Sequence, residues 1–274
     1  MADAAGQSAV AIAVAQFAPG DDTDANLEQM SRLAGDAANR GALLVVFPEY
    51  SSYFTPTMDA RWVEHAQSLH GPFVRGLAEL AAELGVHIVA GMAERVPEEN
   101  TRVANTLVAL DDRGELVARY RKMHLYDAFG QRESDWIVPG PIEEPQTFAF
   151  GGFTVGLQTC YDIRFPEVTR RLVDAGAELV LVPSEWVRGP LKEAHWRTLI
   201  TARAIENTVY VAAADHAPPV GAGNSMIVDP MGVEIATIGE ATDTAVAWIA
   251  PSRVAEVRKV NPALALRRFT VAPS

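Results

Sequence analysis

The sequence predicts a single α/β domain over residues 1–274, folded as a four-layer α-β-β-α sandwich with an approximate internal two-fold repeat. The chain has 274 residues, of which 49% are hydrophobic, and this is enough to enclose a sizeable core. Short apolar runs typical of buried strands alternate with helical stretches, which is the pattern of parallel sheets covered by helices. The order of these runs occurs twice, over about 9–122 and about 151–250, and leaves a C-terminal tail at 251–274.

Each half reads strand, helix, strand, helix, strand and then a hairpin with a glycine at its turn. The matching segments are AIAVAQF (11–17) and FTVGLQT (153–159), RGALLVVFP (40–48) and AGAELVLVP (175–183), GVHIVAG (85–91) and TVYVAAA (208–214), and NTLVALDDRGELVA (105–118) and NSMIVDPMGVEIA (224–236). Strand–helix–strand units pair parallel strands and place the helices on one face. Two such sheets would pack face to face with the helices outside. The alternative is that the halves share only a common order of strands and helices.

The charge and composition exclude several classes of function. With 23 basic and 35 acidic residues, the net charge is −12, and such a surface repels nucleic acids and anionic membranes. The single cysteine excludes an internal disulfide. No apolar run approaches the ~20 residues of a membrane helix, and the first residues lack the basic and apolar blocks of a signal peptide. We therefore expect a cytoplasmic protein with no nucleic-acid or membrane partner.

Three ionisable residues follow predicted strands, where parallel α/β sheets form their sites. Glu49 follows the strand LLVVF, Lys122 follows the hairpin strand ELVARYR, and Cys160 follows FTVGLQT. The other half carries different residues at the corresponding places, near Ser184 for Glu49 and near Ala18 for Cys160. A shared framework with different strand-end residues favours one asymmetric site.

Each of these residues also has an ordinary structural interpretation, since a lone cysteine is most often a small buried apolar residue. Their joint placement favours catalysis instead. Glu49 would take the thiol proton as the sulfur of Cys160 attacks a carbonyl or nitrile carbon. The ammonium of Lys122, helped by the backbone N–H of Tyr161, would stabilise the developing oxyanion.

The motifs around these residues resemble those of the nitrilase superfamily of carbon–nitrogen hydrolases. FPEY (47–50), YRKMHLYD (120–127) and TCYDIRFPE (159–167) match its glutamate, lysine and cysteine motifs in order, and the similarity covers about 9–250. The resemblance implies the α-β-β-α fold. It also implies a second catalytic glutamate, because FGQRESDWIVPG (129–140) is similar to a stretch of the amidase branch; that role falls on Glu133.

The loops that follow the strands supply the expected pocket walls, which include Tyr53, Phe129, Trp186 and Arg188. PSEWVRGPLKEAHW (183–196) resembles the ω-amidase and deaminated glutathione amidase branch, with the extra residues 191–193 interrupting the family pattern. Arg188 is the best placed cation for a substrate carboxylate. The alternative is a solvated Arg188 that pairs with Glu185 or Glu193.

The sequence therefore predicts a thiol amidase that hydrolyses a small aliphatic amide to acid and ammonia through an acyl-enzyme. The nearest alternative is a hydrolase of N-carbamoyl amines or amino acids. An alternative from a different class is a non-catalytic binding or redox-sensing protein. The catalytic and the non-catalytic hypotheses predict different reactivity of the thiol. A catalytic cysteine in an electropositive pocket should react quickly with iodoacetamide at neutral pH, and a buried structural one should not.

No cofactor or metal is expected, because the six histidines form no metal-binding spacing and no nucleotide-binding glycine motif occurs. The tail at 251–274 contains the helical stretch RVAEVRKV and then ALALRRF. We expect it to pack across a neighbouring subunit of a homodimer or larger homo-oligomer, as tails of this family often do. Packing on its own domain is the alternative.

Overall fold

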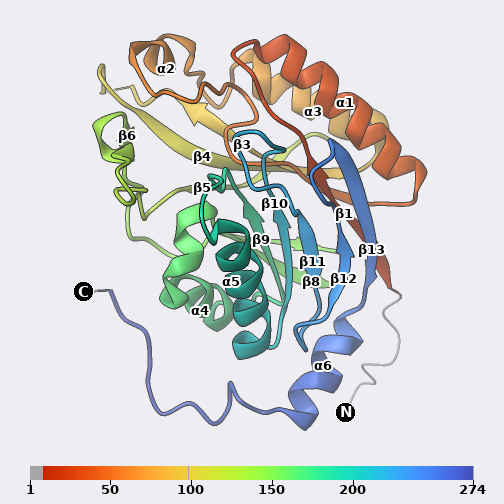
Figure 1. Cartoon of the computed structure of the whole chain (residues 1–274). Coiled ribbons are helices and arrows are strands. Elements are labelled where there is room, and N and C mark those ends of the chain that lie inside the picture. The colour runs from red at the N-terminus through yellow and green to blue at the C-terminus, as the bar shows by residue number, and fades with distance from the viewer. Residues whose placement is uncertain (1–8, 98, 274) are drawn as a thin grey trace.

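The computed structural model describes residues 9–97 and 99–273 and confirms the predicted four-layer α-β-β-α sandwich (Figure 1). Its strands form two mixed sheets whose inner faces pack on one another, and helices cover the outer face of each sheet. Within the described ranges, none of the helices combines the length and the apolar character required to cross a bilayer.

The first sheet has the order β13-β1-β2-β3-β4-β5, and the two-residue strand β6 pairs with β4. Its strands are β1 (Val10–Gln16), β2 (Leu44–Val46), β3 (His87–Glu94), β4 (Val103–Leu110), β5 (Leu116–Arg121), β6 (Ile137–Val138) and β13 (Asp243–Ile249). The strands β1, β2 and β3 run parallel, and β4, β5 and β13 are antiparallel to their neighbours in the path.

The second sheet repeats this arrangement in the order β7-β8-β9-β10-β11-β12. Its strands are β7 (Thr147–Phe150), β8 (Phe153–Leu157), β9 (Leu179–Pro183), β10 (Tyr210–Ala214), β11 (Met226–Val228) and β12 (Glu234–Thr237). Each sheet thus has an antiparallel edge strand, three parallel strands and an antiparallel hairpin. The repeat predicted from the sequence is the repeat of the sheets.

The edge strands depart from the halves expected from the sequence. The strand β13 was expected with the second half, but it pairs with β1 along its whole length, from Val10 opposite Ile249 to Gln16 opposite Asp243. The strand β7 lies between the two predicted halves. The pairing of β13 with β1 therefore joins the end of the second half to the start of the first half.

Four helices form the outer layers. The first sheet is covered by α1 (Thr23–Asn39) and α3 (Pro72–Leu84), and the second by α4 (Pro166–Asp174) and α5 (Lys192–Asn207). The side chain of Asp22 caps α1 by accepting hydrogen bonds from two backbone N–H groups of its first turn. Proline begins α3, and Gly85, with φ of 64°, ends it. The remaining helical elements are α2 (Ala60–His65), α6 (Pro251–Val260) and the short 3₁₀ turns η1 (Glu133–Asp135) and η2 (Cys160–Arg164).

The core lies between and around the sheets. Apolar side chains from both sheets, such as Val46 and Leu181, form one cluster between them, and two further clusters lie under the helices. Because both faces of the central strands are covered, β2, β4, β9 and β10 are buried along their whole length. This burial is the main source of stability of such a fold.

The helical part of the tail packs on its own domain. Val254 and Val257 of α6 are buried, and the arginines at positions 253 and 258 pair with Asp229 and Glu178 at 2.9 and 3.4 Å. For α6, the alternative prediction, that the tail packs on its own domain, is therefore the correct one. Beyond it, Phe269 is 89% exposed, and packing of this last stretch on a neighbouring subunit stays a prediction.

Candidate active site

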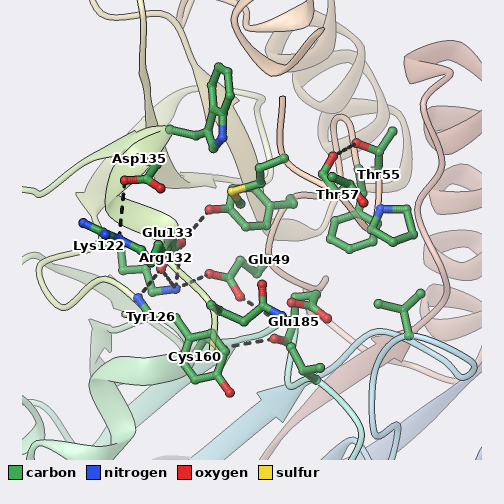
Figure 2. A pocket seen from close by; sticks show the side chains of 18 residues that line it. Glu49, Thr55, Thr57, Lys122, Tyr126, Arg132, Glu133, Asp135, Cys160 and Glu185 are labelled. Carbon is green, nitrogen blue, oxygen red and sulfur yellow. Dashed lines mark hydrogen bonds and ion pairs between the residues drawn. The ribbon is translucent and has the colours of Figure 1, made fainter. Parts of the chain in front are cut away.

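A cavity of about 370 Å³ lies between loops that follow the strands (Figure 2). We call it the main cavity. Glu49, Lys122, Glu133 and Cys160, the four residues predicted to be catalytic, all line it. The other residues that line it are Tyr50, Phe54, Thr55, Pro56, Thr57, Met58, Tyr126, Gln131, Arg132, Asp135, Trp136, Glu185, Val187 and Val220.

Glu49 reaches the cavity because a glycine on the neighbouring strand leaves room for its turn. It lies three residues after β2, and Tyr50 next to it has a left-handed backbone with φ of 55°. A Cβ atom on Gly91 of β3 would lie 2.6 Å from both Glu49 Cα and Tyr50 N. Only glycine allows this close backbone approach.

The Glu49 carboxylate is held by three donors. Oε1 accepts hydrogen bonds from Lys122 Nζ at 2.9 Å and from Asn105 Nδ2 at 2.5 Å, and Oε2 accepts one from the backbone N–H of Glu185 at 2.6 Å. The backbone oxygen of Glu49 is 2.7 Å from His216 Nε2. Burial raises the pKa of Glu49 above its usual value, although Lys122 acts in the opposite direction. A carboxylate with a raised pKa is a better proton acceptor near neutral pH.

Lys122 joins the two glutamates. It directly follows β5, is 2% exposed, and its Nζ lies 2.9 and 3.0 Å from the two carboxylate oxygens of Glu133. Burial alone would lower the pKa of Lys122, but Glu133 and Glu49 raise it well above its usual value. The side chain is therefore an ammonium.

Glu133 is the most extensively bonded residue of the site. Besides the bonds from Lys122, its carboxylate accepts hydrogen bonds from Tyr50 OH at 2.7 Å, from the backbone N–H of Tyr126 at 2.5 Å and from Asn105 Nδ2 at 3.2 Å. It is 6% exposed and begins η1. A surface role for Glu133, which was the alternative from the sequence, does not fit this burial.

The segment that carries Glu133 is held against the lysine strand by another glycine. The backbone N–H of Gly140 donates to Lys122 O at 2.7 Å, and a Cβ on Gly140 would lie 2.2 Å from Arg121 O. The PG pair at 139–140 therefore lets the chain cross the end of β5 closely enough for Glu133 to reach Lys122.

Cys160 begins η2 with a left-handed backbone, φ 42°, three residues after the end of β8. It is 6% exposed, and its thiol donates to the backbone oxygen of Glu185 at 3.4 Å. Burial and the Glu49 carboxylate raise the pKa of the thiol well above its usual value, and Lys122 offsets only part of this. The thiol is therefore protonated at neutral pH.

The expected electropositive pocket is not what surrounds the thiol. In the main cavity the carboxyl groups of Glu49, Glu133 and Glu185 share its surroundings with the ammonium of Lys122, and two further cations, Lys192 and Arg164, line the adjoining space. Because carboxylates disfavour a thiolate, rapid alkylation at neutral pH is no longer expected of Cys160.

Asp162 shapes the turn after Cys160. Its carboxylate accepts hydrogen bonds from the backbone N–H groups of Thr159 and His124, both at 3.1 Å, and from Tyr120 OH at 2.6 Å. These bonds tie η2 to the segment that carries Lys122, so the cysteine and lysine motifs are held together.

Two predicted aromatic wall residues lie elsewhere. Tyr53 is 1% exposed and stacks on His65 in a core cluster, and its neighbour Tyr50 lines the cavity instead. Phe129 is 65% exposed and stacks on Tyr126 outside the cavity lining. The loop residues do follow strands, but their side chains turn toward other partners.

Trp186 and Tyr161 line a much smaller cavity of about 10 Å³, which Cys160 also lines and which we call the adjoining cavity. Arg188 lines neither cavity. Its side chain is 41% exposed and lies 2.9 Å from Glu240 and 3.6 Å from Glu193. The solvated, ion-paired interpretation of Arg188 therefore describes it, because acidic partners outside the site hold the guanidinium.

Several residues of the site were not predicted. Asn105 donates to both Glu49 and Glu133, and Arg132 lines the cavity next to Glu133. Glu185 follows β9, so the same strand-end rule that selected Glu49 could have selected it. Within residues 9–97 and 99–273, no group of three His, Cys, Asp or Glu side chains has the arrangement of a metal site.

Comparisons of the sequence and of the structure with known proteins both find similar proteins. The family model described as "Carbon-nitrogen hydrolase" matches residues 11–259. The chain is 40% identical to the deaminated glutathione amidase of Escherichia coli O157:H7 over 260 residues, which cover 94% of this chain and 97% of the relative. Its structure is similar to that of the C. elegans NitFhit protein, with a TM-score of 0.88 and 29% identity over 96% of this chain and 66% of the other. It is also similar to an amidase from Nesterenkonia sp., with a TM-score of 0.76 and 28% identity over 95% and 97% of the two chains.

Proposed function

The chain belongs to the carbon–nitrogen hydrolase family, and we propose that it hydrolyses a small aliphatic amide to a carboxylic acid and ammonia through a cysteine acyl-enzyme. It is an enzyme that acts on carbon–nitrogen bonds, so a non-catalytic binding or redox-sensing role is set aside. The observation that carries the proposal is that the ammonium of Lys122 joins Glu49 and Glu133 in the cavity that also contains Cys160.

In the first step Glu49 acts as the general base. It accepts the thiol proton as the sulfur of Cys160 forms a bond to the amide carbon, so a thiol that is protonated at rest is no obstacle. The electron pair of the C=O bond moves to oxygen. The ammonium of Lys122 and the backbone N–H of Tyr161 stabilise this oxyanion.

The tetrahedral intermediate then loses its nitrogen. Glu49 returns the proton to the amide nitrogen, the C–N bond breaks, and ammonia leaves a thioester on Cys160. Water completes the cycle, since Glu49 accepts a proton from water as its oxygen attacks the thioester carbon. Collapse of this second intermediate breaks the C–S bond, releases the acid, and returns the proton to the thiol.

In this mechanism Glu133 positions Lys122. Its two oxygens hold Nζ from one side while Glu49 holds it from the other, and the hydroxyl of Tyr50 and the backbone N–H of Tyr126 keep Glu133 in place. A preorganised ammonium needs no reorientation when the oxyanion forms, which is the basis of electrostatic catalysis.

The test measures ammonia release from a panel of small aliphatic amides by the wild type and by Cys160→Ala. We expect turnover by the wild type alone, and an added acyl mass on Cys160 when a slow amide is used and the intact protein is weighed. Wild-type rates in Cys160→Ala would refute the assignment of the nucleophile. Faster release of ammonia and carbon dioxide from an N-carbamoyl amino acid added to the panel would instead identify an N-carbamoyl substrate.

A further inference from the structure

We propose that Glu185 selects the substrate, and that the preferred amides carry an amino group, positively charged at neutral pH, close to the scissile bond. This inference rests on the proposed amidase function and specifies its substrate class. Glu185 lines both the main cavity and the adjoining cavity, and so does Cys160. Figure 2 shows the two residues close together in the main cavity.

The backbone of Glu185 is fixed to the reacting groups. Its N–H donates to Glu49 Oε2 at 2.6 Å, and its carbonyl oxygen accepts the hydrogen bond of the Cys160 thiol at 3.4 Å. A substrate with its carbonyl carbon next to the sulfur therefore lies close to Glu185 as well.

Within the part of the chain that the structure describes, the carboxyl group of Glu185 lacks a hydrogen-bond partner at Oε1 and an ion-pair partner. Oε1 is buried without a hydrogen-bond partner, and no Lys, Arg or His nitrogen among the described residues lies within 4.0 Å of the carboxyl group. Burial and the carboxyl groups of Glu49 and Asp215 raise its pKa well above the usual value. An ammonium ion would supply both the charge and the N–H donors that this carboxyl group lacks.

The cations that line the main cavity already have acidic partners. Lys122 is shared by Glu49 and Glu133, and Arg132 Nε lies 3.6 Å from Asp135 Oδ1. A substrate carboxylate would have to compete with these partners. It would also meet the repulsive field of a protein of net charge −12, which attracts cations instead.

The adjoining cavity, which Glu185 also lines, contains two further cations. Its two cations are Lys192, whose Nζ bonds to Tyr126 OH at 2.6 Å and lies 3.8 Å from the ring centre of Phe129, and Arg164, which lies over the ring of Trp186. Both are held by aromatic groups. In the main cavity, by contrast, the rings of Phe54, Tyr50 and Trp136 are part of the wall, and such rings attract cations.

Three amides with the same three-methylene chain test the inference: 4-aminobutanamide, pentanamide and glutaramate end in an ammonium, a methyl and a carboxylate group. In the wild type we expect kcat/KM for 4-aminobutanamide to exceed that for pentanamide by ~10-fold or more, the scale of one charge-assisted hydrogen bond. Glutaramate should be the poorest substrate. Glu185→Gln, which keeps the shape but cannot become a carboxylate beside an ammonium ion, should abolish the preference for 4-aminobutanamide over pentanamide.

The matched control is Glu193→Gln, which changes an exposed glutamate paired with Arg188 outside both cavities and should leave the ratio intact. A wild-type preference for glutaramate, or an unchanged ratio in Glu185→Gln, would overturn the inference while leaving the amidase proposal in place. If the wild type hydrolyses none of the three amides, this result contradicts the proposed amidase function and not the role of Glu185. Calorimetric binding to Cys160→Ala then still ranks the three amides, and tightest binding of 4-aminobutanamide would support the role of Glu185, whereas any other order, or no binding, would refute it.

Discussion

Lys122 Nζ donates a hydrogen bond of 2.9 Å to Glu49 Oε1, although the two residues lie 73 positions apart in the chain. Both side chains are almost fully buried, at 2% and 1% exposure. A buried ion pair is not by itself a strong source of stability, because desolvation opposes the attraction. Its occurrence in a cavity beside the only cysteine instead favours a catalytic purpose, and the predictions below follow from its geometry.

Lys122→Arg should lower kcat/KM by ~10²-fold or more, although the charge is kept. Three carboxylate oxygens lie within 3.0 Å of Nζ, and a planar guanidinium is too broad for this compact position. Steady-state kinetics would show the loss. Lys259→Arg, on the exposed face of α6, is the matched control and should behave as the wild type. Retained activity in Lys122→Arg would mean that charge alone, without position, suffices.

Glu133→Gln should lower kcat by ~10²-fold or more, because an amide cannot hold the ammonium of Lys122 as a carboxylate does. The matched control is Glu167→Gln, an exposed residue of α4. Circular dichroism would verify that both variants fold. If kcat in Glu133→Gln stays at the wild-type value, the residue serves the structure and does not position the lysine.

Gly91→Ala should damage both activity and stability, because the new Cβ would lie 2.6 Å from Glu49 Cα and the turn that carries the base would have to move. Gly35→Ala is its control. Gly35 lies inside α1 with no atom within 4 Å of the added Cβ, so alanine should stabilise the protein by about 0.5–1 kcal/mol. Urea denaturation and kcat/KM measure the two effects, and equal behaviour of the two variants would contradict the packing argument.

Alkylation of Cys160 by iodoacetamide should be slow at neutral pH and should accelerate only above the usual thiol pKa of about 8.5. The reason is that burial and the Glu49 carboxylate raise the pKa of the thiol. In Glu49→Gln that negative charge is absent, so the thiol pKa should fall and alkylation at neutral pH should become faster while turnover is lost. Mass spectrometry of the labelled protein follows the rate. Fast alkylation of the wild type at neutral pH would show that the resting thiol is ionised.

Stability should fall between about pH 7 and about pH 5, partly because of His216. Burial lowers its pKa from 6.5 to about 4. The folded state therefore binds its proton less readily than the unfolded state, and stability is lost as the pH falls below 6.5. This one residue should account for about 2 kcal/mol over that range. Urea denaturation of the wild type and of His216→Gln measures the term, and His70→Gln, at an exposed position, is the control. An equal pH dependence in wild type and His216→Gln would exclude this source.

Much of the fold and part of the site could be inferred before any coordinates. The succession of strands and helices in each sheet follows from local properties. Apolar runs of strand length that alternate with helical stretches favour parallel strand–helix–strand units. The repeat of that order indicates a second equivalent sheet. The strand-end positions of Glu49, Lys122 and Cys160 follow from the same pattern, since parallel strands bring their ends to one edge, and the motif around Glu133 led to a residue that lies in the same cavity.

The direction of individual side chains could not be inferred in this way. Arg188 was expected in the site and points to Glu240, while Glu185, three positions earlier, lines the cavity. Tyr53 was expected there too, and Tyr50 takes the place. Local sequence specifies that a loop follows a strand. The orientation of each side chain depends on partners that other segments supply, often far along the chain.

The protonation of the site is a collective property as well. The pKa of Cys160 depends on its burial and on Glu49 and Lys122, which come from different strands, and no local pattern specifies how closely these charges approach. The pairing of β13 with β1 is similar, because an edge strand accepts whichever antiparallel partner the closed sandwich brings beside it. Short-range patterns in the chain therefore specify the layers and the candidate residues. Distances, charges and side-chain directions arise from contacts between distant segments, which exist only in the folded molecule.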